Sequence, residues 1–310
     1  MTRIGGQAGA TAAGVQAGKG CGRENPASVS PRCRDGVAGK LESLMAKASR
    51  SRRESKESGP APAKRALLSN PTGEPFQPVR LYYSIADRAD VTKRLRRLKC
   101  MEADSENGGW VWRFEAEAQG LCFLDAGYDD VPLEARPVVL GRIGFPAERS
   151  MTLQVKSIPR AVEGARFFAA RLGAESTPVR CRLVNRFFAL GEGLPHELLQ
   201  LLDKDVTVAE ASGHEARIMR DLQGARTLQE AERALAGSHA RILKSDRDVP
   251  LVEDFPLHPD EESPEFADLE ITLQLRLVRA MEHWMGNTDM TLPALIVRWV
   301  REGLAADPDA

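Results

Sequence analysis

The chain has 310 residues, of which 42% are hydrophobic and 28% charged, and its 43 lysines and arginines nearly balance 44 aspartates and glutamates. These values are ordinary for a globular protein, and the length suffices for one or two domains with a substantial core. Because no run of about 18 apolar residues occurs, the sequence predicts no transmembrane helix, and the N-terminus lacks the apolar core of a signal peptide.

The near-zero net charge conceals an asymmetry along the chain. Residues 1–75 hold 13 lysines and arginines against six acids, whereas the remaining residues hold 30 against 38. The first 75 residues are rich in glycine, alanine, serine, arginine and proline, so they cannot bury enough apolar surface to offset the entropy of ordering. We therefore predict a disordered basic tail over residues 1–75. Its Arg50–Lys56 cluster is interpreted as a solvated linker, with a weak electrostatic hook for nucleic acid or an acidic partner as the alternative.

Cysteine usage bears on the compartment. None of the five cysteines belongs to a C-x-x-C pair, which argues against a disulfide framework and against a zinc ribbon. Reduced thiols fit a cytoplasmic protein best, and Cys181 is expected to be a small buried hydrophobic residue. The five are Cys21, Cys33, Cys100, Cys122 and Cys181.

The first regular elements of the body carry its main basic cluster. Val79–Ile85 is rich in β-forming residues and is predicted as a strand. Asp87 or Asp90 is suited to cap a helix that continues to about Met101. Its cations offer the best surface of the body for an anionic ligand, although a solvated face of an amphipathic helix is the favoured interpretation. These cations are Lys93, Arg94, Arg96, Arg97 and Lys99.

Alternation of apolar and polar residues predicts a sheet over the next hundred residues. Pro159 suits the first turn of a helix capped by Ser157 or Ile158, and Gly173 suits its end. Connections this local favour a mostly antiparallel sheet with helices on one face, so the predicted fold class is α+β, with one domain over residues 76–192. The predicted strands are residues 110–115, 121–124, 137–143, 151–156 and 179–184.

Part of this region carries a resemblance to known proteins. Its residues are Leu140-Gly141-Arg142-Ile143, then Leu153-x-Val155-x-Ser157-x-x-Arg160-Ala161, then Leu172-Gly173. Together they resemble a segment of uncharacterised bacterial proteins, some of which carry a zinc-chelating SEC-C motif or a helical toxin-binding module of the Xre/MbcA/ParS antitoxin type. The resemblance implies a bacterial-type cytoplasmic protein and no particular reaction.

The resemblance to the toxin-binding module extends to the C-terminal half. Trp284 followed by Leu292-Pro293-Ala294-Leu295 resembles that module's tryptophan and Pro-Ala-Leu signature. The module's Gly-Gly-Lys-Thr-Pro segment is absent, with Ile296-Val297-Arg298-Trp299 in its place, and the SEC-C cysteines are absent too.

The histidines show no metal-ligand spacing. His196 lies on a predicted helix over residues 195–202, but Gln200 occupies the place where zinc proteases put a second histidine. We therefore predict no metal, no cofactor and no catalytic residue. The other histidines occur singly, at His214, His239, His258 and His283.

Residues 193–310 are predicted to form a helical domain. Residues 246–270 contain ten acids, one arginine and four prolines, which predicts an irregular acidic linker over about 246–265. Beyond it, a helix over residues 266–285 and a second one after Thr291 should form a hairpin. Trp284 and Trp299 near its ends belong either to a closed core, the favoured interpretation, or to a groove that binds a partner.

The sequence favours a non-enzymatic binding or adaptor protein that contacts another protein and does not enter a membrane. A second hypothesis is a nucleic-acid-binding protein that uses the basic tail and the Lys93–Lys99 helix. A metal-dependent hydrolase is the third, and it ranks last because no nucleophile–base pair or ligand spacing is visible. The sequence names neither the partner nor an oligomeric state. The candidate binding residues are Lys93, Arg94, Arg96, Arg97, Trp284 and Trp299.

Overall fold

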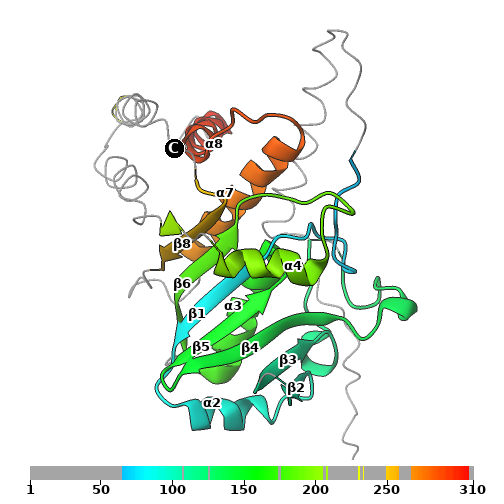
Figure 1. Ribbon diagram of the computed structural model, residues 1–310. Coiled ribbons are helices and arrows are strands. Elements are labelled where there is room, and N and C mark those ends of the chain that lie inside the picture. The colour runs from blue at the N-terminus through cyan, green and yellow to red at the C-terminus, as the bar shows by residue number, and fades with distance from the viewer. Residues whose placement is uncertain are drawn as a thin grey trace, which may run out of the picture. The chain divides into compact units, whose positions relative to one another are not determined.

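The computed structural model describes most of the chain from residue 65 onward (Figure 1). Residues 1–64 of the predicted tail and most of the segment between residues 205 and 248 lie outside the described residues, as do residues 258–265 of the predicted linker. The described residues are 65–106, 108–124, 126–173, 176–204, 207–208, 230, 233, 249–257 and 267–306.

Within the described residues, one eight-stranded sheet organises the fold, in the order β2-β3-β4-β5-β1-β6-β8-β7. Neighbouring strands are antiparallel except β7 and β8, which are parallel. This confirms the α+β class and the mostly antiparallel sheet. The strands are β1 (Val79–Ser84), β2 (Met101–Asp104), β3 (Gly109–Arg113), β4 (Val139–Ala147), β5 (Ser150–Val155), β6 (Thr177–Val184), β7 (Thr207–Val208) and β8 (Val252–Pro256).

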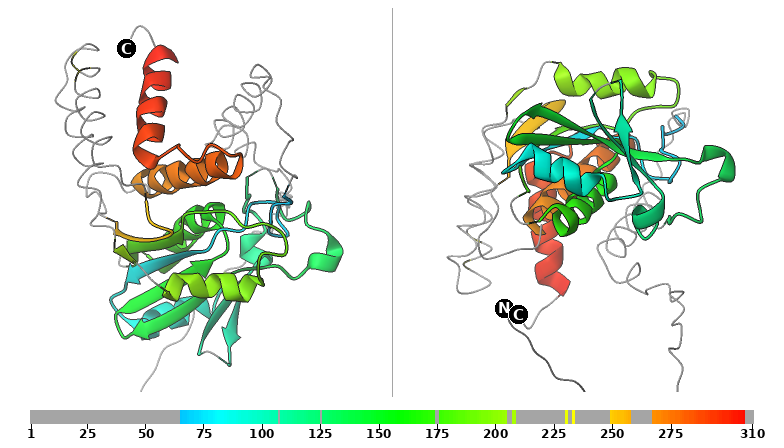
Figure 2. Two further views of the ribbon diagram at one scale, coloured as in Figure 1. Left: turned by 45° about the horizontal axis from the view of Figure 1, so that its top comes forward. Right: turned by 90° about the horizontal axis from the view of Figure 1, so that it is seen from below.

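The helices flank the sheet on both faces, most of them on one. Helices α3 and α7 pack together on one face, α2 contacts α3, and α4 with η4 lies on the opposite face (Figure 2). The predicted C-terminal hairpin is confirmed as α7 followed by α8. The helices are α2 (Arg88–Leu95), η2 (Ala116–Ala118), η3 (Leu133–Ala135), α3 (Ile158–Leu172), α4 (Pro195–Leu199), η4 (Gln200–Asp203), α7 (Ala267–Trp284) and α8 (Leu292–Ala306).

A βαββαβ unit forms the centre of the sheet. Its elements follow one another as β1, α2, β4, β5, α3 and β6, and its strands lie in the order β4-β5-β1-β6. This is the split βαβ arrangement, in which both helices cover the same face. The β2–β3 hairpin is inserted after α2 and extends one edge, while β8 and β7 extend the other. The topology thus leaves the second face of the central strands uncovered by α2, α3 and α7.

Helix α3 forms where local signals predict it. The hydroxyl of Ser157 accepts a hydrogen bond from the backbone N–H of Arg160 at 3.3 Å, which caps the helix, and Pro159 occupies the first turn. Gly173 ends the helix with a φ of 84°, a value that favours glycine. At Gly164 an added Cβ would lie 2.8 Å from Leu153 Cδ2 and 3.1 Å from a Trp112 ring carbon, so this glycine lets α3 approach the sheet closely.

Two predicted boundaries differ from the structure. The acidic segment was expected to be an irregular linker, but residues 252–256 form β8, which pairs with β6 along its length. Residues 65–75 were expected in the disordered tail, yet Asn70, Thr72 and Glu74 are buried against the body. Strands β7 and β8 both come from beyond residue 192, so the C-terminal half contributes to the same sheet and residue 192 is no boundary of that sheet.

Two smaller expectations were also wrong. The helix predicted to reach Met101 ends at Leu95, and Met101 instead begins β2, an edge strand that pairs with β3. Residues 121–124 were predicted as a strand, but they hold only an isolated bridge between Phe123 and Ala126. Both segments are short, and local pattern does not separate a short strand from a turn.

Candidate functional site

The face of the central strands opposite α2, α3 and α7 is lined by polar residues that alternate with the core. Val79, Leu81 and Tyr83 of β1 are buried on the helix-covered side, whereas Arg80 and Tyr82 between them face the other way and are only partly buried. We call this second side the open face. Helices α4 and η4 cover one end of it, where Leu198 and Leu202 pack with the apolar residues Phe76, Val184, Phe188 and Val252.

A row of charged and amide side chains crosses the open face at right angles to the strands. Register places Arg142 opposite Gln154, Gln154 opposite Arg80, Arg80 opposite Arg182, and Arg182 opposite Asp254. Directly opposed residues have their Cβ atoms about 5 Å apart and share one face. Three arginines from three strands therefore stand in one line, a juxtaposition that depends on strand order and that the linear sequence does not display.

A tyrosine lies beside this row among the arginines. Tyr82 pairs with Thr152 on one side and with Arg180 on the other. The guanidinium carbon of Arg180 lies 3.9 Å from the centre of the Tyr82 ring, and that of Arg182 lies 5.5 Å from it. Cations over an aromatic face are attracted by the ring quadrupole, so Tyr82 helps to hold both arginines over the sheet.

Neighbouring carboxylates fix the orientation of the arginines in the row. Arg80 donates from Nη1 to Asp203 Oδ1 at 2.6 Å and from Nη2 to Gln154 Oε1 at 2.6 Å. Burial works to lower the pKa of Arg80, but hydrogen bonds with Asp203 and Tyr82 outweigh it and the pKa is raised. The Arg80 hydrogen bond in turn lowers the pKa of Asp203. Arg80 is therefore charged and held in one direction.

The other arginines are held in the same way. Arg182 donates to Asp254 Oδ2 at 2.6 Å and to the carbonyl of Leu202 at 2.9 Å, and Arg180 lies 3.5 Å from Asp254 Oδ1. Arg142 pairs with Asp104 on β2. The side chains of Arg142 and Arg180 are nonetheless 55% and 44% exposed. A guanidinium has five N–H donors, so these two retain donors toward solvent.

The predicted basic residues occupy a separate place. Lys93 and Arg94 lie in the last turn of α2, and Arg96 and Arg97 follow it; all four are exposed. Helix α2 lies at the opposite end of the sheet from α8 (Figure 1). The structure therefore does not bring these cations together with the two predicted tryptophans.

Trp284 and Trp299 are half-buried on α7 and α8 respectively. Helix α7 has an apolar face, whose residues Leu269, Leu273, Leu277 and Ala280 are buried. Glu282 of α7 accepts a hydrogen bond from Arg298 of α8 at 2.7 Å and another from Asn287 in the turn at 2.6 Å. These contacts fix the hairpin itself, and whether it binds a partner stays a prediction.

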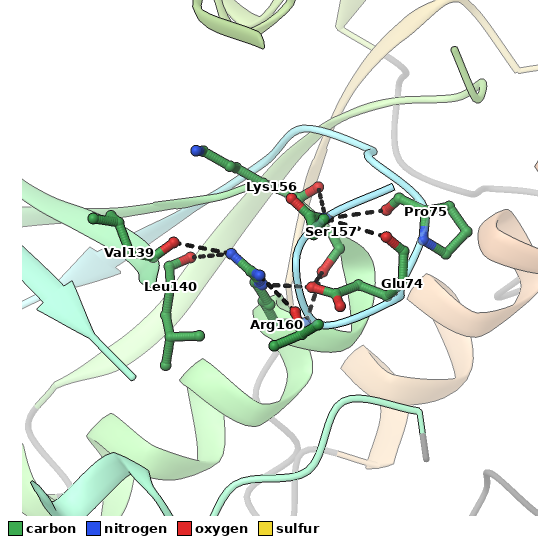
Figure 3. A network of polar contacts seen from close by, with 9 residues as sticks. Glu74, Pro75, Val139, Leu140, Lys156, Ser157 and Arg160 are labelled. Carbon is green, nitrogen blue, oxygen red and sulfur yellow. Dashed lines mark hydrogen bonds and ion pairs between the residues drawn. The ribbon is translucent and has the colours of Figure 1, made fainter. Parts of the chain in front are cut away.

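Two buried ion pairs were not foreseen from the sequence. Arg160 and Glu74, both 0% exposed, meet at 2.5 Å, and Arg160 also donates to Thr72 Oγ1 and to the carbonyl of Val139 (Figure 3). This pair fastens the segment before β1 to α3 and β4.

In the second pair, Arg276 of α7 donates two hydrogen bonds, of 2.6 and 2.7 Å, to the carboxylate of Glu253 in β8. Both side chains are nearly inaccessible. The two pairs join segments that are distant in sequence, and they offer no surface to a ligand.

The metal-dependent hydrolase gains no candidate site in the described part of the chain. There, no three histidine, cysteine, aspartate or glutamate side chains gather as metal ligands. His196 lies in α4 and His283 at the end of α7, where its Nε2 lies 2.8 Å from the carbonyl oxygen of Met290. No helix that the structure describes is both long and apolar enough to span a bilayer.

The described cysteines predict a simple order of reactivity. Burial raises the pKa of Cys100 to about 12, with Glu117 acting in the same direction, and burial raises the pKa of Cys181 as well. Thiolate is the reactive form, so both should resist alkylation of the native protein at pH 8. Among these three described cysteines, we expect iodoacetamide to modify the half-buried Cys122 first, as measured by peptide mass spectrometry. Equal labelling of all three in native protein would contradict this expectation.

Comparison with known proteins does not assign the chain to a family. No protein-family model matches the chain, and neither a curated protein nor a solved structure matches it significantly. The resemblance to SEC-C and Xre/MbcA/ParS proteins stays a prediction. Two of the residues that carry it have roles in folding, since Ser157 caps α3 and Arg160 is buried with Glu74. The candidate site therefore stands on its geometry.

Proposed function

We propose that this chain is a non-enzymatic binding protein of the adaptor type, which receives another protein on the open face of its sheet. The observation that carries the proposal is the row of Arg142, Gln154, Arg80 and Arg182, in direct cross-strand register on the side that α2, α3 and α7 leave uncovered. A cytoplasmic location, expected from the cysteines, belongs to the same proposal.

The composition of the open face supports a protein as the partner. Arginine and tyrosine are enriched in the residues that contribute most to protein–protein affinity, whereas lysine is depleted in such interfaces. The open face presents Arg142, Arg180 and Tyr82 on a rigid sheet. Because Asp104, Asp254 and the Tyr82 ring already orient the arginines, binding orders few side chains and loses little entropy.

The partner is expected to present carboxylates. An arginine recognises a carboxylate through two parallel N–H···O bonds, and Arg142 and Arg180 are the two arginines of the face with the most exposed side chains. The carboxylates of this chain would share these arginines with those of the partner. Such sharing favours specific, moderately tight association that weakens as salt increases.

A photocrosslinking experiment tests the proposal in the source cell. A benzoylphenylalanine at position 152, beside Tyr82, should form a discrete adduct with another protein on irradiation. The same residue at position 133, whose leucine is 75% exposed outside the sheet, serves as the control for random contact. We expect the adduct at 152 and not at 133.

Charge reversal then tests the arginines. The double variant Arg142→Glu/Arg180→Glu should reduce the adduct about tenfold or more, because hot-spot arginines each contribute above about 1 kcal/mol. The variant Arg96→Glu/Arg97→Glu changes the net charge equally outside the open face and should leave the adduct intact. The absence of a protein adduct at position 152, or an equal loss in both double variants, would refute the proposal.

A further inference from the structure

The last turn of α2 and the residues after it form a cluster of exposed cations that the open face does not use. We call this set, Lys93, Arg94, Arg96, Arg97 and Lys99, the basic corner. Among the described residues, Arg94 is paired with Asp90 at 2.8 Å, and no ion pair involves the other four. The arginines of the open face, by contrast, are each held by a carboxylate.

Neighbouring charges leave the basic corner strongly positive. Arg171 of α3 lies near it, since it acts on the nearby thiol of Cys100, and an added Cβ at Gly173 would lie 3.3 Å from Arg94 Nη1. The acids in contact are Asp90, which pairs with Arg94, and Glu117, which accepts hydrogen bonds from the backbone N–H groups of Lys99 and Cys100 at 3.1 and 3.0 Å. Among the described residues, two carboxylates thus face six cations. Because the sequence beyond residue 75 is acidic overall, this concentration of positive charge is a local exception.

The surface around these cations does not fit a protein partner. Protein interfaces contain an apolar centre that becomes fully buried. Over Arg88–Lys99, Val91 and Leu95 are buried and Leu98 is half-buried, and no large hydrophobic side chain of this range is among the exposed ones. Nor does the cluster contain an aromatic residue on which an unpaired base could stack, as single-strand binders require. What it offers is positive charge alone.

From these observations we propose that the basic corner binds the phosphate backbone of double-stranded nucleic acid without reading its sequence. A duplex carries one negative charge per about 1.7 Å of its axis, and cations that neutralise phosphates release condensed counterions. This driving force needs exposed lysines and arginines that are free of internal ion pairs, which is what Lys93, Arg96, Arg97 and Lys99 supply. The site is separate from the open face, so the two proposals can fail independently.

Salt dependence of binding tests the inference on the full chain. Binding to a fluorescently labelled DNA duplex of about 24 base pairs is followed by anisotropy from 50 to 200 mM NaCl. The logarithm of the binding constant should fall linearly with the logarithm of salt concentration. Each phosphate contact contributes about −0.9 to the slope, so Arg96→Gln/Arg97→Gln should make it shallower by about 1.8. At 0.1 M salt the same variant should bind roughly 60-fold more weakly.

The matched control removes the same charge from the open face. The variant Arg142→Gln/Arg180→Gln also neutralises two exposed arginines and should leave the slope within about 0.5 of the unmodified chain, because its arginines are outside the basic corner. The predicted tail is identical in all three proteins and cancels from the comparison. Unchanged thermal unfolding of each variant shows that the fold is retained.

Three outcomes would overturn the inference. One is no binding of the unmodified chain to the duplex at 50 mM NaCl, and a second is an equal change of slope in both double variants. The third concerns membranes, whose anionic headgroups also attract basic clusters. Binding to vesicles of phosphatidylserine and phosphatidylcholine that depends on Arg96 and Arg97, without such binding to the duplex, would assign the basic corner to a lipid surface instead.

Discussion

Replacing Arg160 by leucine is expected to lower the free energy of unfolding by about 3–5 kcal/mol. The substitution leaves the Glu74 carboxylate at a site that is 0% exposed, without the guanidinium that lies 2.5 Å from it. It also removes the donors to Thr72 Oγ1 at 2.6 Å and to the carbonyl of Val139 at 3.0 Å. Urea denaturation at pH 7, followed by circular dichroism, measures the loss as a lower midpoint.

Two further variants show whether the loss arises from an uncompensated buried charge. The double variant Glu74→Met/Arg160→Leu has no such charge and should recover most of the stability, since apolar replacements of buried pairs are often neutral. Arg94→Leu breaks the exposed pair with Asp90 and should cost less than about 1 kcal/mol. If Arg160→Leu cost no more than Arg94→Leu, the pair with Glu74 would contribute no more than a surface contact.

Local sequence signals predicted the elements whose cause is local. Ser157, Pro159 and Gly173 define helix α3 because a cap, a fixed φ and a positive φ each act within one turn. Strands β1 and β5 follow from alternation, because one side of each strand is buried and the other is not. These local signals were enough to predict the α+β class without knowledge of tertiary contacts.

The acidic strand β8 could not be predicted in this way. Density of carboxylates normally indicates a solvated segment, and Glu253 and Asp254 were interpreted so. Their charges are instead compensated by Arg276 of α7 and Arg182 of β6, which lie 23 and 72 residues away in sequence. Composition within a short window does not contain partners at such distances. For the same reason the burial of Glu74 could not be predicted, because its partner Arg160 is 86 residues away.

The two candidate sites also differ in how far local sequence signals could predict them. The exposure of Lys93 and Arg94 follows from the amphipathic pattern of α2 and could be predicted. The other three cations of the basic corner follow the end of that helix, where the sequence predicted that the helix continues. The open face required the order of strands, because Arg142, Arg80 and Arg182 are far apart in sequence and become neighbours only when β5 and β1 lie between β4 and β6. Alternation predicted which side of each strand is polar. The register of the paired strands, which alternation does not predict, aligns the polar residues of those sides in one row.

Replacing Arg276 by alanine is expected to cost about 3–5 kcal/mol and to loosen α7 from the sheet. Arg276 donates from Nε and Nη2 to the two oxygens of Glu253, and its guanidinium carbon lies 4.3 Å from the centre of the Phe255 ring. Without Arg276, the buried Glu253 carboxylate keeps the hydrogen bond that Asn185 Nδ2 donates to it at 2.9 Å. Amide hydrogen exchange should show lost protection in both α7 and β8, together with a lower urea midpoint.

The control for this experiment is another ion pair of the same helix. Arg166 of α3 pairs with Glu270 of α7 at the surface, with 48% of the arginine side chain exposed. Arg166→Ala should change stability by less than about 1 kcal/mol and leave the exchange of β8 unaffected. Should Arg276→Ala behave like Arg166→Ala, the apolar contacts of Leu273 and Leu277 would suffice to hold α7. A selective loss in α7 and β8 would instead establish that one buried ion pair joins the C-terminal helices to the sheet.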